Sequence, residues 1–370
     1  MNNIGEFMNW IKTFFIAIFL VGCGQADRGK AYVTSQDGGV TVIDLNTYEV
    51  IDQLDIGGLP RGLGLTDDGK FLVAANKDHA SLTEVNLETK EVAQNIDVGI
   101  NPEFVRIKGD LAFVSTEPSS EGKPPAKGEM KHEEEHDDDD DKTPAKVAVV
   151  DLNTGKKVRD ITAGPETEGI EFSADGTKII ITNEADNTVT VHDFESGELL
   201  KTVKAEAYGE RPRGIKVSPD GNYYISTLEF SDNFIVLDQD FNHVKTVNTT
   251  HDVSEDNPHK GKSPYGVSFN TSGDKLFVAT TGGRGNRSAL EIYDTKTFEK
   301  VNRIETDGRR CWHFSFTPDD QDLLLACGRS DEVLVIDSNS YEIKKRIAIS
   351  GIPWGIVTYP KSTGSLDQKN

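Results

Sequence analysis

A four-strand pattern recurs seven times along this 370-residue chain, and the repeat limits the fold more than any other feature. In six copies an alternating apolar strand ends in Asp, as in TVIDLNTYEV, and the seventh copy has Asn86 there. The six acids are Asp44, Asp151, Asp193, Asp238, Asp294 and Asp337. Each copy also contains an earlier strand and a tight turn such as SPDG at residues 218–221. A unit of about 42 residues with these features predicts one blade of a β-propeller.

The last unit of the repeat is split between the two ends of the chain. GIPWGIVTYP (351–360) begins a unit, and the three strands that would complete it are KAYVTS (30–35), GVTVID (39–44) and EVIDQLDI (49–56). Pairing the two parts would close a ring and remove an open sheet edge. The sequence therefore predicts an all-β, seven-bladed propeller over residues 30–360, closed by the N-terminal strands pairing with the C-terminal strand, with a flexible tail at 361–370.

The N-terminal segment is typical of an export signal. The apolar run Thr13–Val21 is too short to remain as a membrane-spanning helix, and the LVGC at 20–23 resembles the bacterial lipobox. We expect residues 1–23 to be a signal peptide with Cys23 as the lipidated residue, and 24–29 to be a short linker. An uncleaved anchor with a chance cysteine is the alternative. Because Gly24 rather than Asp follows Cys23, we expect a periplasm-facing lipoprotein of the cell envelope, in the outer membrane if the cell is Gram-negative.

The chain is strongly acidic, with a formal net charge of −22, which argues against nucleic acid as a partner. About a quarter of this charge lies in an insertion at 117–146, which we expect to be disordered because it has too few apolar residues to offset the entropy cost of ordering. Its His132 and His136, next to Asp137–Asp141, could hold a divalent metal ion. The competing interpretation is a solvated loop, since carboxylate runs bind such ions weakly without a rigid loop.

Seven residues stand at equivalent strand starts and predict a ring at one mouth of the central channel. They are Arg61, Glu103, Glu168, Arg213, Tyr265, Trp312 and Trp354. The aromatic arc could stack a flat ligand while the arginines hold its carboxylates, so a small anionic planar ligand, such as a PQQ-like tricarboxylate, is one expected partner. A peptide or protein loop is another. The alternative is that the aromatic rings plug the channel and the charges pair with one another.

Two further features lie in the last complete unit. His313 follows Trp312 at a position where most units have Gly, and it could ligate a metal ion or haem or be a hydrogen-bonded structural histidine. Covalent c-type haem is excluded because no Cys-x-x-Cys-His motif occurs. Cys311 and Cys327 lie on two adjacent predicted strands, where a cross-strand disulfide competes with two buried free thiols.

The motifs AYVTS and FVATT and the PDG-type turns resemble the YVTN-type propeller family over residues 30–360. RRCWHFSFTPDD (309–320) and GIPWG are similar to the propeller proteins associated with PQQ-dependent alcohol catabolism, and the wider superfamily includes the haem d1 domain of nitrite reductase. The resemblance implies a binding or scaffold protein linked to a PQQ- or haem-dependent dehydrogenase system. An oxidoreductase or electron-transfer protein with a non-covalent haem-like or quinone-like cofactor is the alternative.

Catalytic signatures are missing from the sequence. It contains no Gly-x-Ser-x-Gly, no His-Glu-x-x-His and no P-loop. This favours a protein that is not an enzyme and that requires no cofactor.

Overall fold

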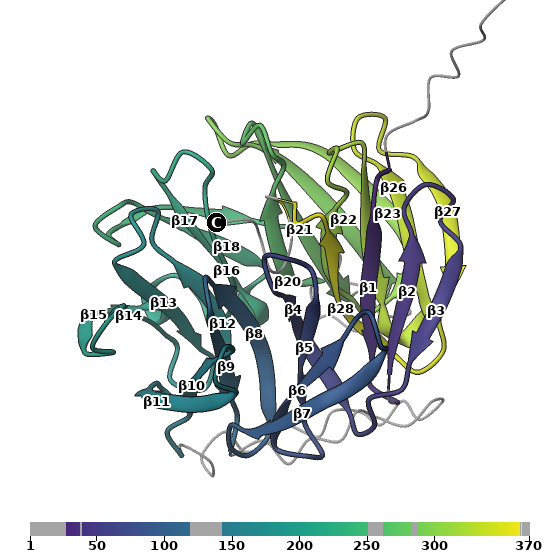
Figure 1. Cartoon of the computed structure of the whole chain (residues 1–370). Helices are drawn as coiled ribbons and strands as arrows, with labels where there is room; N and C mark the ends of the chain where they lie inside the picture. The colour runs from purple at the N-terminus through teal and green to yellow at the C-terminus, as the bar shows by residue number, and fades with distance from the viewer. Residues whose placement is uncertain are drawn as a thin grey trace, which may run out of the picture.

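The computed structural model describes residues 27–37, 39–118, 143–250, 262–282, 287–362 and 364. These residues form seven four-stranded antiparallel sheets that follow one another around a ring (Figure 1). The prediction of an all-β, seven-bladed propeller is confirmed.

The blades are numbered here in chain order, and the strands of each are given from the channel outward. Blade 1 contains β28 (Pro353–Tyr359), β1 (Lys30–Ser35), β2 (Val40–Asp44) and β3 (Val50–Leu54). Blade 2 contains β4 (Pro60–Leu65), β5 (Phe71–Asn76), β6 (Ser81–Asn86) and β7 (Glu91–Asp97). Blade 3 contains β8 (Pro102–Lys108), β9 (Leu111–Thr116), β10 (Lys146–Asp151) and β11 (Lys156–Thr162). Blade 4 contains β12 (Thr167–Phe172), β13 (Lys178–Asn183), β14 (Thr188–Asp193) and β15 (Leu199–Lys204).

The remaining blades have the same order of strands. Blade 5 contains β16 (Pro212–Val217), β17 (Tyr224–Leu228), β18 (Asn233–Leu237) and β19 (His243–Asn248). Blade 6 contains β20 (Lys262–Phe269), β21 (Lys275–Gly282), β22 (Arg287–Asp294) and β23 (Lys300–Arg309). Blade 7 contains β24 (Cys311–Phe316), β25 (Asp322–Cys327), β26 (Glu332–Asp337) and β27 (Ile343–Ala348). The described helices are single 3-10 turns: η1 (Ala205–Ala207), η2 (Glu229–Ser231) and η4 (Gly328–Ser330).

The ring closes as predicted, because β1 pairs antiparallel with β28, with Lys30 opposite Tyr359 and Val33 opposite Ile356. Each inner strand also contacts the inner strand of the next blade, and this cycle runs through β24, β28 and β4 without a gap. We call the end of the channel at which the inner strands begin the mouth, and the end at which they finish the far end.

The repeated Asp of the sequence has a structural cause. At the end of β2 the Asp44 carboxylate accepts hydrogen bonds from the backbone N–H groups of Asn46 at 2.7 Å and Thr47 at 2.9 Å. Asp151, Asp193, Asp294 and Asp337 accept the same pair of bonds in their own blades. The acid therefore fixes the turn to the outermost strand, where Ser, Asn and Asp side chains commonly bond the backbone two residues ahead.

The core lies between the blades. Buried apolar residues of each sheet pack on the facing sheet, as Ala31 and Val33 of blade 1 do against Leu324 and Ala326 of blade 7. Removal of these side chains from water supplies the main stabilisation, at about 25 cal/mol for each Å² of apolar surface. The outermost strands are mainly exposed, and each of β7, β11 and β19 has a single buried residue near its end.

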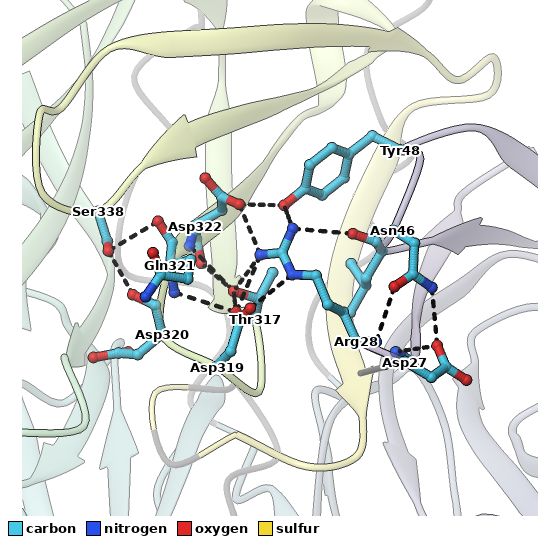
Figure 2. Close-up of polar contacts among 12 residues, drawn as sticks. Asp27, Arg28, Asn46, Tyr48, Thr317, Asp319, Asp320, Gln321, Asp322 and Ser338 are labelled. Carbon is cyan, nitrogen blue, oxygen red and sulfur yellow. Dashed lines mark hydrogen bonds and ion pairs between the residues drawn. The ribbon is translucent and has the colours of Figure 1, made fainter. Parts of the chain in front are cut away.

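Residues 27–29, the described part of the expected linker at 24–29, are held against the propeller. The guanidinium of Arg28 lies 2.7 Å from Asp319 and 2.8 Å from Asp322 in blade 7, and donates to the Tyr48 hydroxyl of blade 1 across 2.7 Å (Figure 2). Lys344 also reaches Asp322, at 2.7 Å. Arg28 thus ties the two blades that flank the closure.

The start of the expected flexible tail is also packed. Lys361 forms an ion pair with Asp67 at 3.0 Å, and Ser362 is buried. The backbone N–H of Phe316 donates to the carbonyl of Gly364 across 3.2 Å. The chain therefore continues past β28 across the far end of the channel, and the boundary of the ordered region lies beyond residue 360.

Residues at both ends of the expected acidic insertion at 117–146 belong to the propeller. Glu117 and Ala145 are buried and Lys146 begins β10, so these three residues belong to the propeller and not to a disordered loop. Cys23, His132 and His136 lie outside the described residues. Within the part of the chain that the structure describes, no helix has the length and apolar character needed to cross a membrane.

Candidate functional site

The seven residues of the predicted ring all lie at the mouth, each within a β-bulge of its inner strand. In blade 2, Pro60 is opposite Asn76 but Leu63 is opposite Ala74, so three steps on the inner strand match two on its neighbour. The same shift occurs at the equivalent place in the other six blades. Because a bulge changes the direction of a side chain, it aims each ring residue at the channel in the same way.

The aromatic arc of the ring is packed. Tyr265, Trp312 and Trp354 are 6%, 6% and 2% exposed and belong to the largest apolar cluster of the molecule. The guanidinium carbon of Arg310 lies 5.3 Å from the centre of the Trp312 ring, and that of Arg213 lies 5.2 Å from the Tyr265 ring. The stacking face predicted for a flat ligand is therefore covered by neighbouring side chains.

The charged arc forms a network of ion pairs. Arg61 pairs with Glu103 of the next blade. Arg213 lies 2.8 Å from Glu168 and has two further carboxylate partners at 2.8 and 3.1 Å, Glu229 and Glu184. Pairing of the charges with one another was the alternative that the sequence left open, and these charges are paired in the structure.

A second circle of residues surrounds the first and was missed in the sequence. These residues follow the second strand of each blade, and each donates its backbone N–H to the residue two places before the ring residue. In six blades they are Gln36, Lys77, Glu117, Glu184, Glu229 and Gly328. The signal was present as the repeated strand ends VSTE, ITNE and STLE, which place a glutamate in three consecutive blades.

The residues two places before the ring carry further charge. Arg211 lies 2.9 Å from Glu166 and also pairs with Glu184. Arg211, Glu166 and Arg310 have positive φ angles of 57°, 50° and 52°, a conformation that residues other than glycine seldom adopt. Such positions cost about 1–3 kcal/mol each and gather at binding sites.

Burial changes the protonation of the mouth carboxyls. It raises the pKa of Glu168 to about 8, against the opposing effect of Arg213 and with a further rise from Glu117. Burial likewise raises the pKa of Glu117 and raises that of Glu184 well above its usual value. Glu229 differs: burial acts against its charge, but Arg213 and Arg211 outweigh burial and lower its pKa. Burial therefore favours the protonated form of Glu117, Glu168 and Glu184, whereas the neighbouring arginines favour the ionised form of Glu229.

His313 lies beneath the ring, against aromatic side chains. Its ring centre is 4.3 Å from that of Trp354 and 6.0 Å from that of Phe104, the other residue that replaces Gly at this position. Elsewhere Gly is needed because the inner strands are close: a Cβ on Gly266 would lie 2.3 Å from the Trp312 carbonyl oxygen. Burial, followed by repulsion from Arg213 and Lys216, lowers the pKa of His313 to about 3, so the imidazole is neutral.

His313 Nε2 is buried and has no hydrogen-bond partner among the described residues. A hydrogen-bonded structural histidine was the competing interpretation, and this nitrogen does not fit it. Buried polar atoms without a partner are rare, and such an atom is often explained by a ligand or a bound water.

Three carboxyl groups at the mouth lie close enough together to hold a cation. Oxygens of Glu103, Glu117 and Glu168 lie within 4.8 Å of one another, and all three residues are buried. Arg61 lies against Glu103 and Arg213 against Glu168, so two of the three carboxyls already have a cationic neighbour. The other predicted metal ligands, His132 and His136, lie outside the described residues.

A third charged layer crosses the middle of the channel. Arg106 lies 2.9 Å from Glu171, and Lys216 lies 3.7 Å from the same carboxylate. All three are buried. The repeat did not predict charge in this layer. The equivalent positions of the other inner strands are Gly64, Val357 and two serines.

Cys311 and Cys327 are directly opposite each other on β24 and β25 and form a disulfide in the structure. Both are buried, and the bond lies one residue from Trp312 at the mouth. Gly308 packs against both sulfurs, because a Cβ there would lie 2.8 and 2.9 Å from them.

The fold and the site together define a seven-bladed β-propeller with a charged channel mouth and a buried histidine beneath it. The family model described as "Lactonase, 7-bladed beta-propeller" matches residues 138–260, about a third of the chain. Among curated proteins, the chain is similar to protein NirF of Pseudomonas aeruginosa, with 20% identity over 86% of this chain and 66% of NirF. It is also similar to the dihydro-heme d1 dehydrogenase of the same organism, with 22% identity over 88% of this chain and 61% of that protein.

Solved structures give the same fold. The Pseudomonas aeruginosa periplasmic gluconolactonase PpgL has a TM-score of 0.69 at 16% identity, covering 89% of this chain and 98% of PpgL. The dihydro-heme d1 dehydrogenase NirN in complex with DHE has a TM-score of 0.62 at 18% identity, covering 90% of this chain and 76% of NirN. At these identities the structural likeness concerns the fold alone. The chain spans less than two thirds of the length of the NirF and dehydrogenase relatives.

Proposed function

We propose that the channel mouth binds a planar, carboxylate-bearing tetrapyrrole of the haem d1 class without a covalent bond. The observation that carries this proposal is His313, whose neutral and buried imidazole has a nitrogen without a hydrogen-bond partner. Neutral imidazole is the commonest metal ligand among side chains and a usual axial ligand of haem iron. The sequence similarity to NirF and to a dihydro-heme d1 dehydrogenase supports the same ligand class. This sequence similarity supports a cofactor-binding protein better than a scaffold protein.

The arginines of the mouth suit the carboxylates of such a ligand. Arg61 and Arg213 are held at the ring by the bulges, and guanidinium groups bind carboxylates in a bidentate manner. Both already pair with glutamates, so a ligand carboxylate must take the place of Glu103 or Glu168. The raised pKa of Glu168, about 8, allows the displaced group to take up a proton instead of leaving a buried negative charge.

The roles of the protein side chains follow from these contacts. His313 would hold the metal of the cofactor, and the arginines would fix its orientation. A bound haem-type group would supply electron-transfer chemistry, which the side chains of the mouth cannot provide themselves. A PQQ-like tricarboxylate has the same planar and anionic character and is the competing ligand.

Absorption spectroscopy tests the ligand class. Full-length protein would be titrated separately with haem d1, protohaem and PQQ, using wild type, Arg213→Ala and the control Arg159→Ala, an arginine on the outer strand β11. We expect saturable binding of a tetrapyrrole that Arg213→Ala weakens and Arg159→Ala does not. Binding of PQQ alone would assign the site to a quinone, and binding of none of the three would reject the proposal.

We also propose that the protein is exported and anchored by a lipid on Cys23, facing the periplasm. The support is the LVGC sequence and the short apolar run before it. Mass spectrometry of the N-terminal peptide tests this directly, because a lipidated Cys23 would be the first residue of the mature chain.

Hydrolysis of a lactone is a second candidate function. It is favoured by the family model, whose matched residues include the Glu168, Glu184, Arg211, Arg213 and Glu229 network of the mouth. A colourless protein that opens a six-carbon sugar lactone faster than buffer, and loses this activity in Glu168→Gln, would support it over the cofactor-binding proposal.

A further inference from the structure

We infer that the lipid anchor holds the far end of the propeller toward the membrane and the mouth toward the aqueous compartment, so that the mouth receives its ligand from a soluble donor. This inference rests on the proposed lipidation of Cys23 and is independent of which ligand the mouth binds.

The chain enters the propeller at the far end. Lys30, the first residue of β1, is opposite Tyr359, near the end of the inner strand β28, whereas Ser35 at the end of β1 is opposite Pro353, where β28 begins. The first strand therefore runs from the far end to the mouth. The anchored side of the chain and the mouth lie at opposite ends of the channel.

Arg28 fixes the point of entry two residues earlier. Its guanidinium lies 2.7 Å from Asp319, in the turn that joins β24 to β25 at the far end, and 2.8 Å from Asp322, the first residue of β25 (Figure 2). Asp322 is buried, and the side chain of Arg28 is 13% exposed. The tether to the membrane therefore begins at Arg28.

The length of the tether excludes the orientation in which the mouth lies on the bilayer. Five residue steps separate Cys23 from Arg28, and a fully extended chain spans about 18 Å over this distance. The six residues of β1 span about 20 Å, and the turns at the mouth extend further. With the mouth on the bilayer, Arg28 would lie above the lipid surface at a height that the tether cannot reach. The tether can still reach the membrane when the far end, or the outer strands of the blades, lie toward it.

The far end of the channel is covered by the chain itself. Gly364 packs so closely on Phe316 that a Cβ would lie 2.4 Å from its ring, and 2.7 Å from the Phe269 carbonyl oxygen. Ser362 is buried there, and Lys361 pairs with Asp67 at 3.0 Å. A ligand leaving the bilayer would meet this packed surface first, whereas the arginines of the ring lie at the opposite end. Among the described residues, it is therefore the mouth, and not the far end, from which a donor in the aqueous compartment would reach these arginines.

Two positions on one blade give a matched pair of reporters. Ile100 is 66% exposed just before β8 at the mouth, and Asp110 is exposed just after β8 at the far end. In the lipidated protein a cysteine at either place is the single free thiol, because Cys311 and Cys327 are joined. Ile100→Cys and Asp110→Cys in the full chain would each be labelled with a fluorophore and bound to phosphatidylethanolamine–phosphatidylglycerol vesicles that carry a nitroxide on the lipid headgroup.

We expect the label at 110 to be quenched at least about twice as strongly as the label at 100, because nitroxide quenching needs close approach to the headgroups. Equal quenching, or stronger quenching at 100, would overturn the inference. Mass spectrometry and vesicle co-flotation are measured first, with Cys23→Ser as the control. A chain without lipid, or one that floats equally well as Cys23→Ser, would remove the premise and overturn the inference, while ligand titration in solution would be unaffected.

A longer tether tests the cause of the orientation. Inserting 20 Gly/Ser residues between Ala26 and Asp27 adds a coil with a root-mean-square length of about 25 Å, more than the roughly 20 Å that β1 spans. We expect the difference between the two labels to shrink markedly in this variant. A difference that persists unchanged would show that tether length does not orient the molecule, against this inference.

Discussion

The guanidinium of Arg28 lies 2.8 Å from the carboxylate of Asp322, a buried residue 294 positions further along the chain. This contact joins the N-terminal segment to blade 7 next to the closing strand pair (Figure 2). We predict that Arg28→Ala lowers the free energy of unfolding by about 1–3 kcal/mol, because a buried carboxylate loses a partner while Lys344 and Tyr48 remain. Chemical denaturation monitored by tryptophan fluorescence measures this change.

The control for Arg28→Ala is Arg287→Ala. Arg287 pairs with Asp307 at the same distance of 2.8 Å, but both side chains are more than 60% exposed. An exposed pair contributes about 0–1 kcal/mol. Equal destabilisation by the two substitutions would contradict a role for Arg28 in closing the ring.

The stability of the protein should fall as the pH rises above neutrality. The folded protein holds a proton on Glu168 up to a pKa of about 8, whereas the usual value is 4.5, so it binds more protons than the unfolded chain in this window. One such group gives a slope of up to about 1.4 kcal/mol per pH unit. We predict that the melting temperature falls between pH 6.5 and 8 and levels off above this range, and that Glu168→Gln reduces the fall.

Two features make this prediction specific. His313, with a pKa lowered from 6.5 to about 3, makes stability rise with pH up to about 7, so it opposes the fall only at the start of the measured window. Glu88→Gln, at an exposed position, should leave the slope unchanged. A slope that is the same in wild type and Glu168→Gln would show that Glu168 is ionised throughout.

The disulfide closes a segment with a sequence separation of 16 residues. In the chain-entropy description a loop of this size contributes about 3 kcal/mol. We predict that the double variant Cys311→Ala, Cys327→Ala loses about this amount. Alkylation of denatured protein should give no adducts on these residues without reductant and two with it. Two adducts without reductant would mean that the residues are free thiols in the cell.

The sequence was sufficient for the fold because the repeat is marked by local chemistry. Asp44 and its equivalents fix one turn in every blade, and the split unit required closure by β1 and β28. Arg28 and Gly364 could not be predicted, because their partners lie in other blades and single residues in polar segments carry no periodic signal.

The site was predictable only in part. The ring of seven residues follows from the repeat, since equivalent strand starts must meet at one end of the channel. Whether the aromatic side chains of this ring are open or packed depends on residues from several blades. Tyr265, Trp312 and Trp354 are packed. Glu184 and Glu229 could have been predicted, because a glutamate recurs at this position in consecutive blades. The pairing of Arg106 with Glu171 could not, because no other blade has a counterpart.

The most direct measurement is the visible spectrum of haem d1 bound to wild-type protein and to His313→Gly. This substitution removes the imidazole and leaves the residue found at the same place in five of the other blades. We predict that wild type gives a saturable spectrum of a histidine-ligated iron, that His313→Gly loses this signature, and that added imidazole restores it. An identical spectrum and affinity in His313→Gly would contradict the assignment of His313 as the ligand at the mouth.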